Sequence, residues 1–146
     1  MCYALFIGSD EPLPVEDLTT ADGRFHLEEL QPGHSAVLPL FSKPHVRYAS
    51  SWQGCGCGWF PGTLLLQRKK TRADSDRKTA RDISQLRQLI EELLSRHDRV
   101  ELYLGWEGEL TRAPERLVDL SPGDFAGDAL PMQQGDFAVV FRVSPI

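Results

Sequence analysis

Two cysteines, Cys55 and Cys57, are separated by a single glycine inside the glycine-rich segment Gly54–Gly58. In an extended chain, side chains two residues apart point to the same side, with Cα atoms about 7 Å apart. Several glycines in such a segment usually mark a bend, or a place where another backbone approaches closely. Both thiols could therefore reach a single metal ion, and a bend at the glycines would bring them closer together.

A zinc site usually needs about four ligands, and cysteine and histidine predominate in structural sites. Cys2 opens the first apolar segment of the chain, and it would lie beside Cys55 and Cys57 if the two segments pair as strands. We take His45 as the fourth ligand because it begins the segment that leads into the motif. The alternatives for that position are the other histidines, His26, His34 and His97. The sequence thus predicts a thiol-based metal site, with zinc as the first choice of ion.

Three other interpretations of the cysteines remain open. Cys55 and Cys57 could close a strained disulfide, which would be labile and competent for thiol redox exchange. Cys2 would become an N-terminal nucleophile if Met1 were removed, as in glutamine amidotransferases that begin Met-Cys-Gly-Ile. This chain has Tyr3 in place of that glycine, and 146 residues is short for the fold of those enzymes. Finally, a reduced cysteine can simply be a small core residue.

Other residues that could do chemistry give weaker signals. The carboxylates near the C-terminus lack the spacing of a calcium loop, and the tryptophans could line a pocket or fill the core. These residues are Asp119, Asp124, Asp128 and Asp136, and Trp52, Trp59 and Trp106. The chain contains no serine nucleophile elbow, P-loop, dinucleotide fingerprint or H-E-x-x-H zinc motif. The balance of these features is against an enzyme.

The charge of the chain is unevenly distributed. The net charge is −5, but residues 68–81 carry +5, which leaves −10 on the rest of the chain. An acidic chain argues against a general nucleic-acid binder, because neutralising phosphates requires a basic face. We predict that residues 68–80 form a mobile basic connector before a helix. That connector could contact an acidic protein partner, so the competing hypothesis is a non-catalytic interaction module with structural cysteines.

Hydrophobic periodicity predicts the elements that would position these residues. Apolar residues at three- and four-residue steps, from Ile83 to Leu94, predict a long amphipathic helix over about 75–97. Apolar runs and alternation predict strands over 2–8, 24–30, 45–52, 99–106, 115–120 and 136–143. Because these strands do not alternate with helices, we expect a single α+β domain over residues 1–146. Its sheet would be mostly antiparallel, with the helix packed on one face.

The apolar segments are too short to span a membrane, so we expect no membrane partner. None approaches the roughly 18 residues of a membrane span, and the N-terminus lacks the basic and apolar regions of a signal peptide. The cysteine count is three, an odd number, whereas secreted disulfide frameworks use even numbers. We therefore expect a cytoplasmic protein with reduced thiols.

Several strings in the first 60 residues carry a resemblance to a known group. They are Met1-Cys2, Leu5-Phe6-Ile7-Gly8-Ser9-Asp10, Pro12-Leu13-Pro14, His45-Val46 and Gly54-Cys55-Gly56-Cys57-Gly58. With these strings the chain resembles a family of small uncharacterised bacterial proteins that carries no assigned activity. The resemblance implies a bacterial cytosolic origin and gives no catalytic role to any residue.

Overall fold

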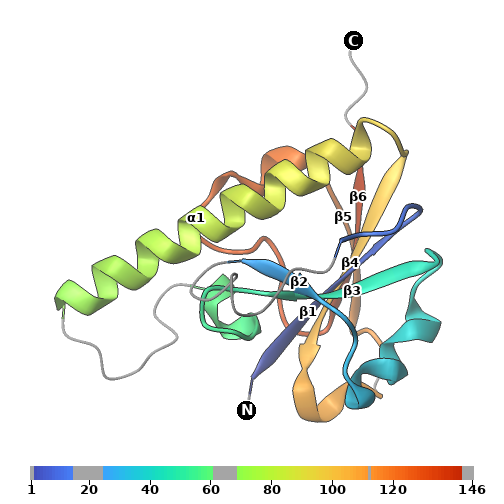
Figure 1. Cartoon of the computed structure of the whole chain (residues 1–146), viewed down its shortest axis with the longest axis horizontal. Helices are drawn as coiled ribbons and strands as arrows, with labels where there is room; N and C mark the ends of the chain where they lie inside the picture. Colours follow the sequence, from blue (N-terminus) through green and yellow to red (C-terminus); the bar gives the residue numbers. More distant parts are fainter. Residues whose placement is uncertain (1, 15–24, 61–68, 112, 143–146) are drawn as a thin grey trace.

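A long helix crossing one face of a six-stranded sheet dominates the molecule (Figure 1). The structure is a computed structural model that describes residues 2–14, 25–60, 69–111 and 113–142, without the side chains of 69–73. The helix is α1 (Lys69–Leu94). The strands are β1 (Tyr3–Ser9), β2 (His26–Glu28), β3 (His45–Ser50), β4 (Arg99–Trp106), β5 (Arg116–Leu120) and β6 (Asp136–Phe141). Short 3₁₀ helices are η1 (Pro32–Leu40), η2 (Gly56–Trp59), η3 (Glu107–Glu109) and η4 (Pro122–Ala126).

The strand order in the sheet is β2-β3-β1-β4-β6-β5. Every neighbouring pair is antiparallel except β5 and β6, which run parallel. The prediction of an α+β fold with one main helix is confirmed, whereas the sheet is mixed. A parallel pair needs a connection of about a dozen residues or more. Residues 121–135 provide that connection, and η4 within it packs against α1.

The sheet is covered by apolar side chains on both faces. On one face, Leu5 and Ile7 of β1 belong to the core cluster shared with the apolar stripe of α1. On the other, Ala4 and Phe6 belong to a second cluster that includes Val37 of η1. Alternating side chains of a strand point to opposite faces. Two buried faces therefore explain why β1 is a continuous apolar run rather than an alternating one.

The helix begins earlier than its apolar stripe. It starts at Lys69, about six residues before the predicted start, and ends at Leu94. The prediction that residues 68–80 form a connector is therefore corrected: residues 69–80 are helical, and residue 68 lies outside the described residues. Lysine, arginine and alanine are good helix formers. Asp74 also forms ion pairs with Arg77 at 3.1 Å and Lys78 at 3.2 Å, at helical spacings that support the first turns.

Other predicted boundaries shift by a few residues. The strand predicted over 24–30 is confined to β2. The predicted last strand, 136–143, corresponds to β6, which ends at Phe141, and residue 143 lies outside the described residues. Within the described part of the chain, no helix is long and apolar enough to cross a membrane.

Candidate metal centre

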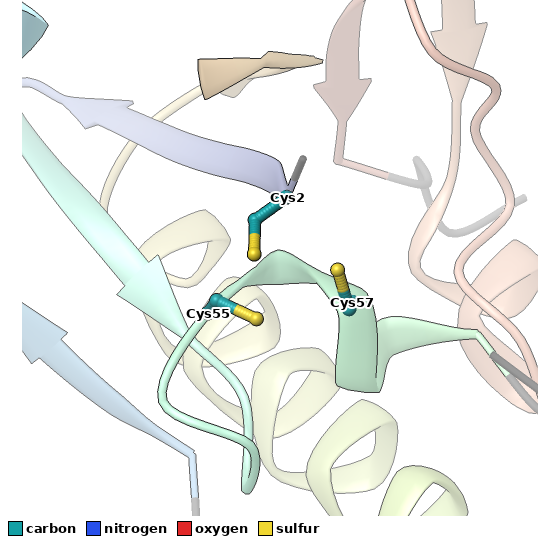
Figure 2. A group of neighbouring side chains, drawn as sticks. All are labelled: Cys2, Cys55 and Cys57. Carbon is teal, nitrogen blue, oxygen red and sulfur yellow. The ribbon is translucent and has the colours of Figure 1, made fainter. Parts of the chain in front are cut away.

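The three cysteines of the chain meet at one end of the sheet. Cys2 directly precedes β1, Cys55 lies in the loop after β3, and Cys57 lies on η2 (Figure 2). Their sulfur atoms all lie within 4.8 Å of one another, and no disulfide joins them. Sulfurs bound to one zinc ion at about 2.3 Å are separated by about 3.8 Å. Small rotations of the side chains would thus bring all three into coordination distance.

Antiparallel pairing of β1 and β3 brings the two parts of this cluster together. Leu5 of β1 is opposite Ala49 of β3, so the start of β1 lies beside the end of β3. The chain leaves β3 at Ser50 and enters the loop that carries Cys55 and Cys57. The predicted approach of Cys2 to the motif is confirmed, and its cause is the register of these two strands.

A tight turn then directs the loop back across the end of β1. The backbone N–H of Gly54 donates to the carbonyl of Ser51 at 2.9 Å, and Gly54 has a φ of +79°, which favours glycine. Both the N–H of Ser51, at 3.1 Å, and its hydroxyl, at 2.5 Å, donate to the carbonyl of Cys55. These bonds fix the position of Cys55 relative to the end of β3.

Close packing against β1 explains the glycine between the two cysteines. A Cβ atom at Gly56 would lie 2.5 Å from the carbonyl oxygen of Tyr3 and 2.7 Å from its carbonyl carbon. A Cβ atom at Gly58 would collide with the hydroxyl of Ser51. Only glycine allows this approach, and Gly56–Trp59 adopts a 3₁₀ turn rather than an extended strand. The two thiols converge because the chain bends between them.

Helix α1 also anchors the loop that carries Cys55 and Cys57. Asp82 is fully buried and accepts hydrogen bonds from the backbone N–H groups of Phe25, at 3.1 Å, and Trp52, at 2.6 Å. The hydroxyl of Thr79 donates to the carbonyl of Gly58 at 2.8 Å. Burial raises the pKa of Asp82, although the hydrogen bonds from Trp52 and Phe25 oppose the rise. The helix therefore holds the loop at two points on either side of the cysteines.

His45 does not belong to the cluster, which corrects the predicted fourth ligand. It begins β3 and pairs with Ser9 at the end of β1, whereas Cys2 precedes the start of β1. Five residues of antiparallel strand separate it from Ser50, a distance of about 17 Å at about 3.4 Å per residue. His45 therefore cannot bind the same ion as the three cysteines.

The remaining histidines are also absent from the group of three sulfurs among the described residues. His97 contacts Glu11 at 3.1 Å, near the end of α1. His26 lies 3.3 Å from Glu28 within β2. His34 is buried, and its Nε2 lies 3.1 Å from an oxygen of Glu107.

Glu107 is a residue near the cysteines that sequence reasoning did not find. Its backbone N–H donates to the carbonyl of Cys2 at 2.9 Å, which continues the pairing of Tyr3 with Trp106. In the sequence, Glu107-Gly108 reads only as a turn. The signal that identifies Glu107 is the register between β1 and β4, which hydrophobic patterning does not specify.

The surroundings of the cluster disfavour an isolated thiolate. Burial raises the pKa of the Cys55 thiol to about 12, and the neighbouring Cys57 thiol adds to the rise, although the backbone N–H of Cys57 opposes it. A bound cation would instead lower the pKa of these thiols, since a thiol that coordinates a metal ion is deprotonated outright. The cluster is thus suited to a metal ion more than to an activated nucleophile, which requires a lowered pKa.

We expect Cys55 of the metal-free protein to react slowly with iodoacetamide. With a pKa raised to about 12, the thiolate fraction at pH 8 is small and grows as the pH rises towards that value. Alkylation should be at least about tenfold slower than in the unfolded chain, where the pKa is ordinary. Tandem mass spectrometry, which separates Cys55 from Cys57, measures both rates in chelator, with and without urea. Equal rates in the two states would contradict the expectation.

Three of the other candidates from the sequence, Asp124, Asp136 and Trp59, have structural roles. Asp136 is buried and pairs through both carboxylate oxygens with Arg116, at 2.9 and 2.7 Å. Asp124 accepts from the backbone N–H of Ser121 at the start of η4. Trp59 is fully buried and donates to the carbonyl of Ala49. Among the described residues, the cysteine cluster is the one group of three or more potential metal ligands that lie this close together.

The fold and the site together define a small α+β protein with a three-cysteine cluster at one end of its sheet. Comparison with protein-family models, with curated proteins and with solved structures finds no match.

Proposed function

We propose that this protein binds one thiophilic metal ion, with zinc as the first choice, through Cys2, Cys55 and Cys57. The observation that supports the proposal is the convergence of all three cysteines of the chain, whose sulfurs lie within 4.8 Å of one another. Thiolate sulfur is a preferred ligand of zinc and of Cu(I). The tight turn and the close glycine contacts provide a specific framework for the three sulfurs.

The ion would tie the first strand of the sheet to the loop after β3. Cys2 and Cys55 are distant in sequence, so a shared ion closes a long loop of the chain and adds its binding free energy to the stability of the fold. Because zinc-bound cysteines are thiolates, binding also releases their protons. These requirements fit a reducing, cytoplasmic environment, where thiols are not oxidised.

Metal analysis and competitive titration against a chromophoric chelator test the proposal. The protein is purified without a histidine tag, and we expect about one zinc per chain, bound by three cysteines. Substitution of Cys2, Cys55 or Cys57 by serine should weaken zinc binding at least about tenfold each, because a ligand is lost. His45→Ala is the matched control, and it should bind zinc like the original chain.

Two results would contradict metal binding. The first is a zinc, iron or copper content below about a tenth of an equivalent, together with no zinc uptake in the chelator titration. The second is a disulfide among these cysteines at a glutathione-like potential with no metal bound. The disulfide would appear as a mass loss of about 2 Da that a reductant reverses, and it would favour a redox role instead.

A further inference from the structure

We propose that Glu107 is the fourth ligand of this metal site and that His34 positions its carboxylate. This inference rests on the proposed metal binding and extends it, because it completes the coordination sphere and specifies the class of ion. A site of three thiolates and one carboxylate favours a divalent ion such as zinc over Cu(I), since oxygen ligands suit harder ions.

The register between β1 and β4 places Glu107 directly across from Cys2. Tyr3 pairs with Trp106, and the next pair along the strands is marked by the 2.9 Å hydrogen bond from the N–H of Glu107 to the carbonyl of Cys2. The Cβ atoms of directly opposed residues in an antiparallel pair lie about 4.5–5.5 Å apart. Glu107 therefore starts within one side-chain length of a sulfur ligand.

Strand alternation, continued by one residue beyond β1 and β4, predicts that the side chains of Cys2 and Glu107 point to the same side of the sheet. Tyr3 and Trp106 stack on each other, with ring centroids 4.2 Å apart, and their neighbours Cys2 and Glu107 alternate to the opposite face. That face is the one on which His34 packs edge-on against Phe6, with ring centroids 5.1 Å apart. The contact between His34 and Glu107 confirms that the carboxylate is on this side.

His34 holds the carboxylate in a defined orientation. Its Nδ1 accepts a hydrogen bond from the backbone N–H of Gln31 at 3.2 Å, so a neutral ring carries its proton on Nε2. Nε2 then donates to Oε2 of Glu107 at 3.1 Å. Carboxylates that bind metals are usually held by such a second hydrogen bond. A carboxylate has enough lone pairs to accept from His34 and coordinate an ion at the same time.

Acidic groups and a thiol lie close to Tyr48 at this end of the sheet. Burial raises the pKa of Tyr48 above its ordinary range, and the further contributions that raise it come from Glu107, Cys55 and Glu28. A carboxylate such as Glu107 attracts a cation placed near it. Glu107 itself is about one third exposed, with 35% of its side-chain surface accessible.

Coordination requires one movement of this side chain. Its oxygens are not within the group of ligand atoms that lie within 4.8 Å of one another. In the proposed movement, rotation about the Glu107 side-chain torsions turns Oε1 towards the three sulfurs, while Oε2 keeps its hydrogen bond to His34 and the hydrogen bond to Cys2 keeps the backbone in place. The attraction between the cation and the carboxylate supplies the driving force.

Glu107→Gln tests the proposal, with Glu109→Gln in the same turn as the matched control. Affinities for Zn²⁺, Co²⁺ and Cu(I) are measured by chelator competition, together with the visible spectrum of the Co²⁺ protein. We expect E107Q to weaken Zn²⁺ and Co²⁺ binding by about 10- to 100-fold, to shift the Co²⁺ bands, and to leave Cu(I) affinity unchanged. E109Q should behave like the original chain in all three respects.

The outcomes separate this inference from the function on which it rests. An original chain that binds none of the three ions overturns metal binding altogether, and the ligand assignment with it. If the original chain binds Zn²⁺, and E107Q has the same affinity and the same Co²⁺ spectrum, only the assignment of Glu107 is overturned. An equal loss of Cu(I) affinity in E107Q would also overturn it, because it would indicate general damage to the site. Thermal unfolding of E107Q and of Glu107→Ala checks that each variant is folded.

Discussion

Gly56→Ala is expected to remove most of the zinc affinity from a protein that still carries all three cysteines. The new Cβ atom would lie 2.5 Å from the carbonyl oxygen of Tyr3, a backbone atom that cannot rotate away. Either η2 or the start of β1 must shift, and both carry ligands. A shift in the support of a metal site typically weakens binding about 10- to 100-fold. Overpacking of this kind also costs about 1–3 kcal/mol of stability.

Chelator competition measures the zinc affinity of this variant, and urea unfolding measures its stability. Gly127→Ala is the matched control, because a Cβ atom at Gly127 meets nothing within 4 Å and its φ is −92°. The control should keep both the affinity and the stability of the original chain. Zinc binding by G56A with unchanged affinity would show that the close approach of the loop to Tyr3 does not determine the geometry of the site.

Asp82→Ala is expected to lower the free energy of unfolding by about 3 kcal/mol, because it leaves two backbone donors without their acceptor in a buried position. These donors are the N–H groups of Phe25 and Trp52, which belong to segments far apart in the sequence. Asp82 itself is fully buried, so water does not replace the lost oxygens. The loop that carries Cys55 and Cys57 would lose one of its two anchors to α1.

Urea unfolding followed by circular dichroism measures this loss, with the midpoint shifting at constant slope. Asp74→Ala on the same helix is the control, since Asp74 is about half exposed and forms surface ion pairs with Arg77 and Lys78. Such pairs contribute about 0–1 kcal/mol, so the control should change little. A loss of similar size in both variants would mean that removing any carboxylate from α1 lowers the free energy of unfolding, and that Asp82 is not a specific anchor.

The local elements were largely predictable from the sequence because their signals are local. The apolar stripe from Ile83 to Leu94 identified α1, and the alternation in β4 and β6 identified those strands. The start of α1 was misplaced because residues 69–80 lack an apolar stripe. Charged side chains with good helix propensity and helical ion pairs hold those turns without one.

The candidate site was predictable only in part. The pair Cys55 and Cys57 is visible in the sequence because the two residues are neighbours, and Cys2 followed from the expectation that two strands pair. The choice of His45 was wrong because the pairing direction decides which end of β3 meets Cys2, and the antiparallel register places His45 opposite Ser9. Glu107 was missed for the same reason, since it becomes a neighbour of Cys2 only through β4.

The sequence by itself thus determined the elements and the chemistry available to them: one amphipathic helix, a set of short strands and three thiols. These properties depend on contacts within a few residues, which periodicity and composition report. Only the tertiary structure decided that the three sulfurs share one space, and which of the histidines and carboxylates lie near it. Strand register sets those distances, and β1, which is apolar and buried on both faces, has no alternating pattern that would specify its register.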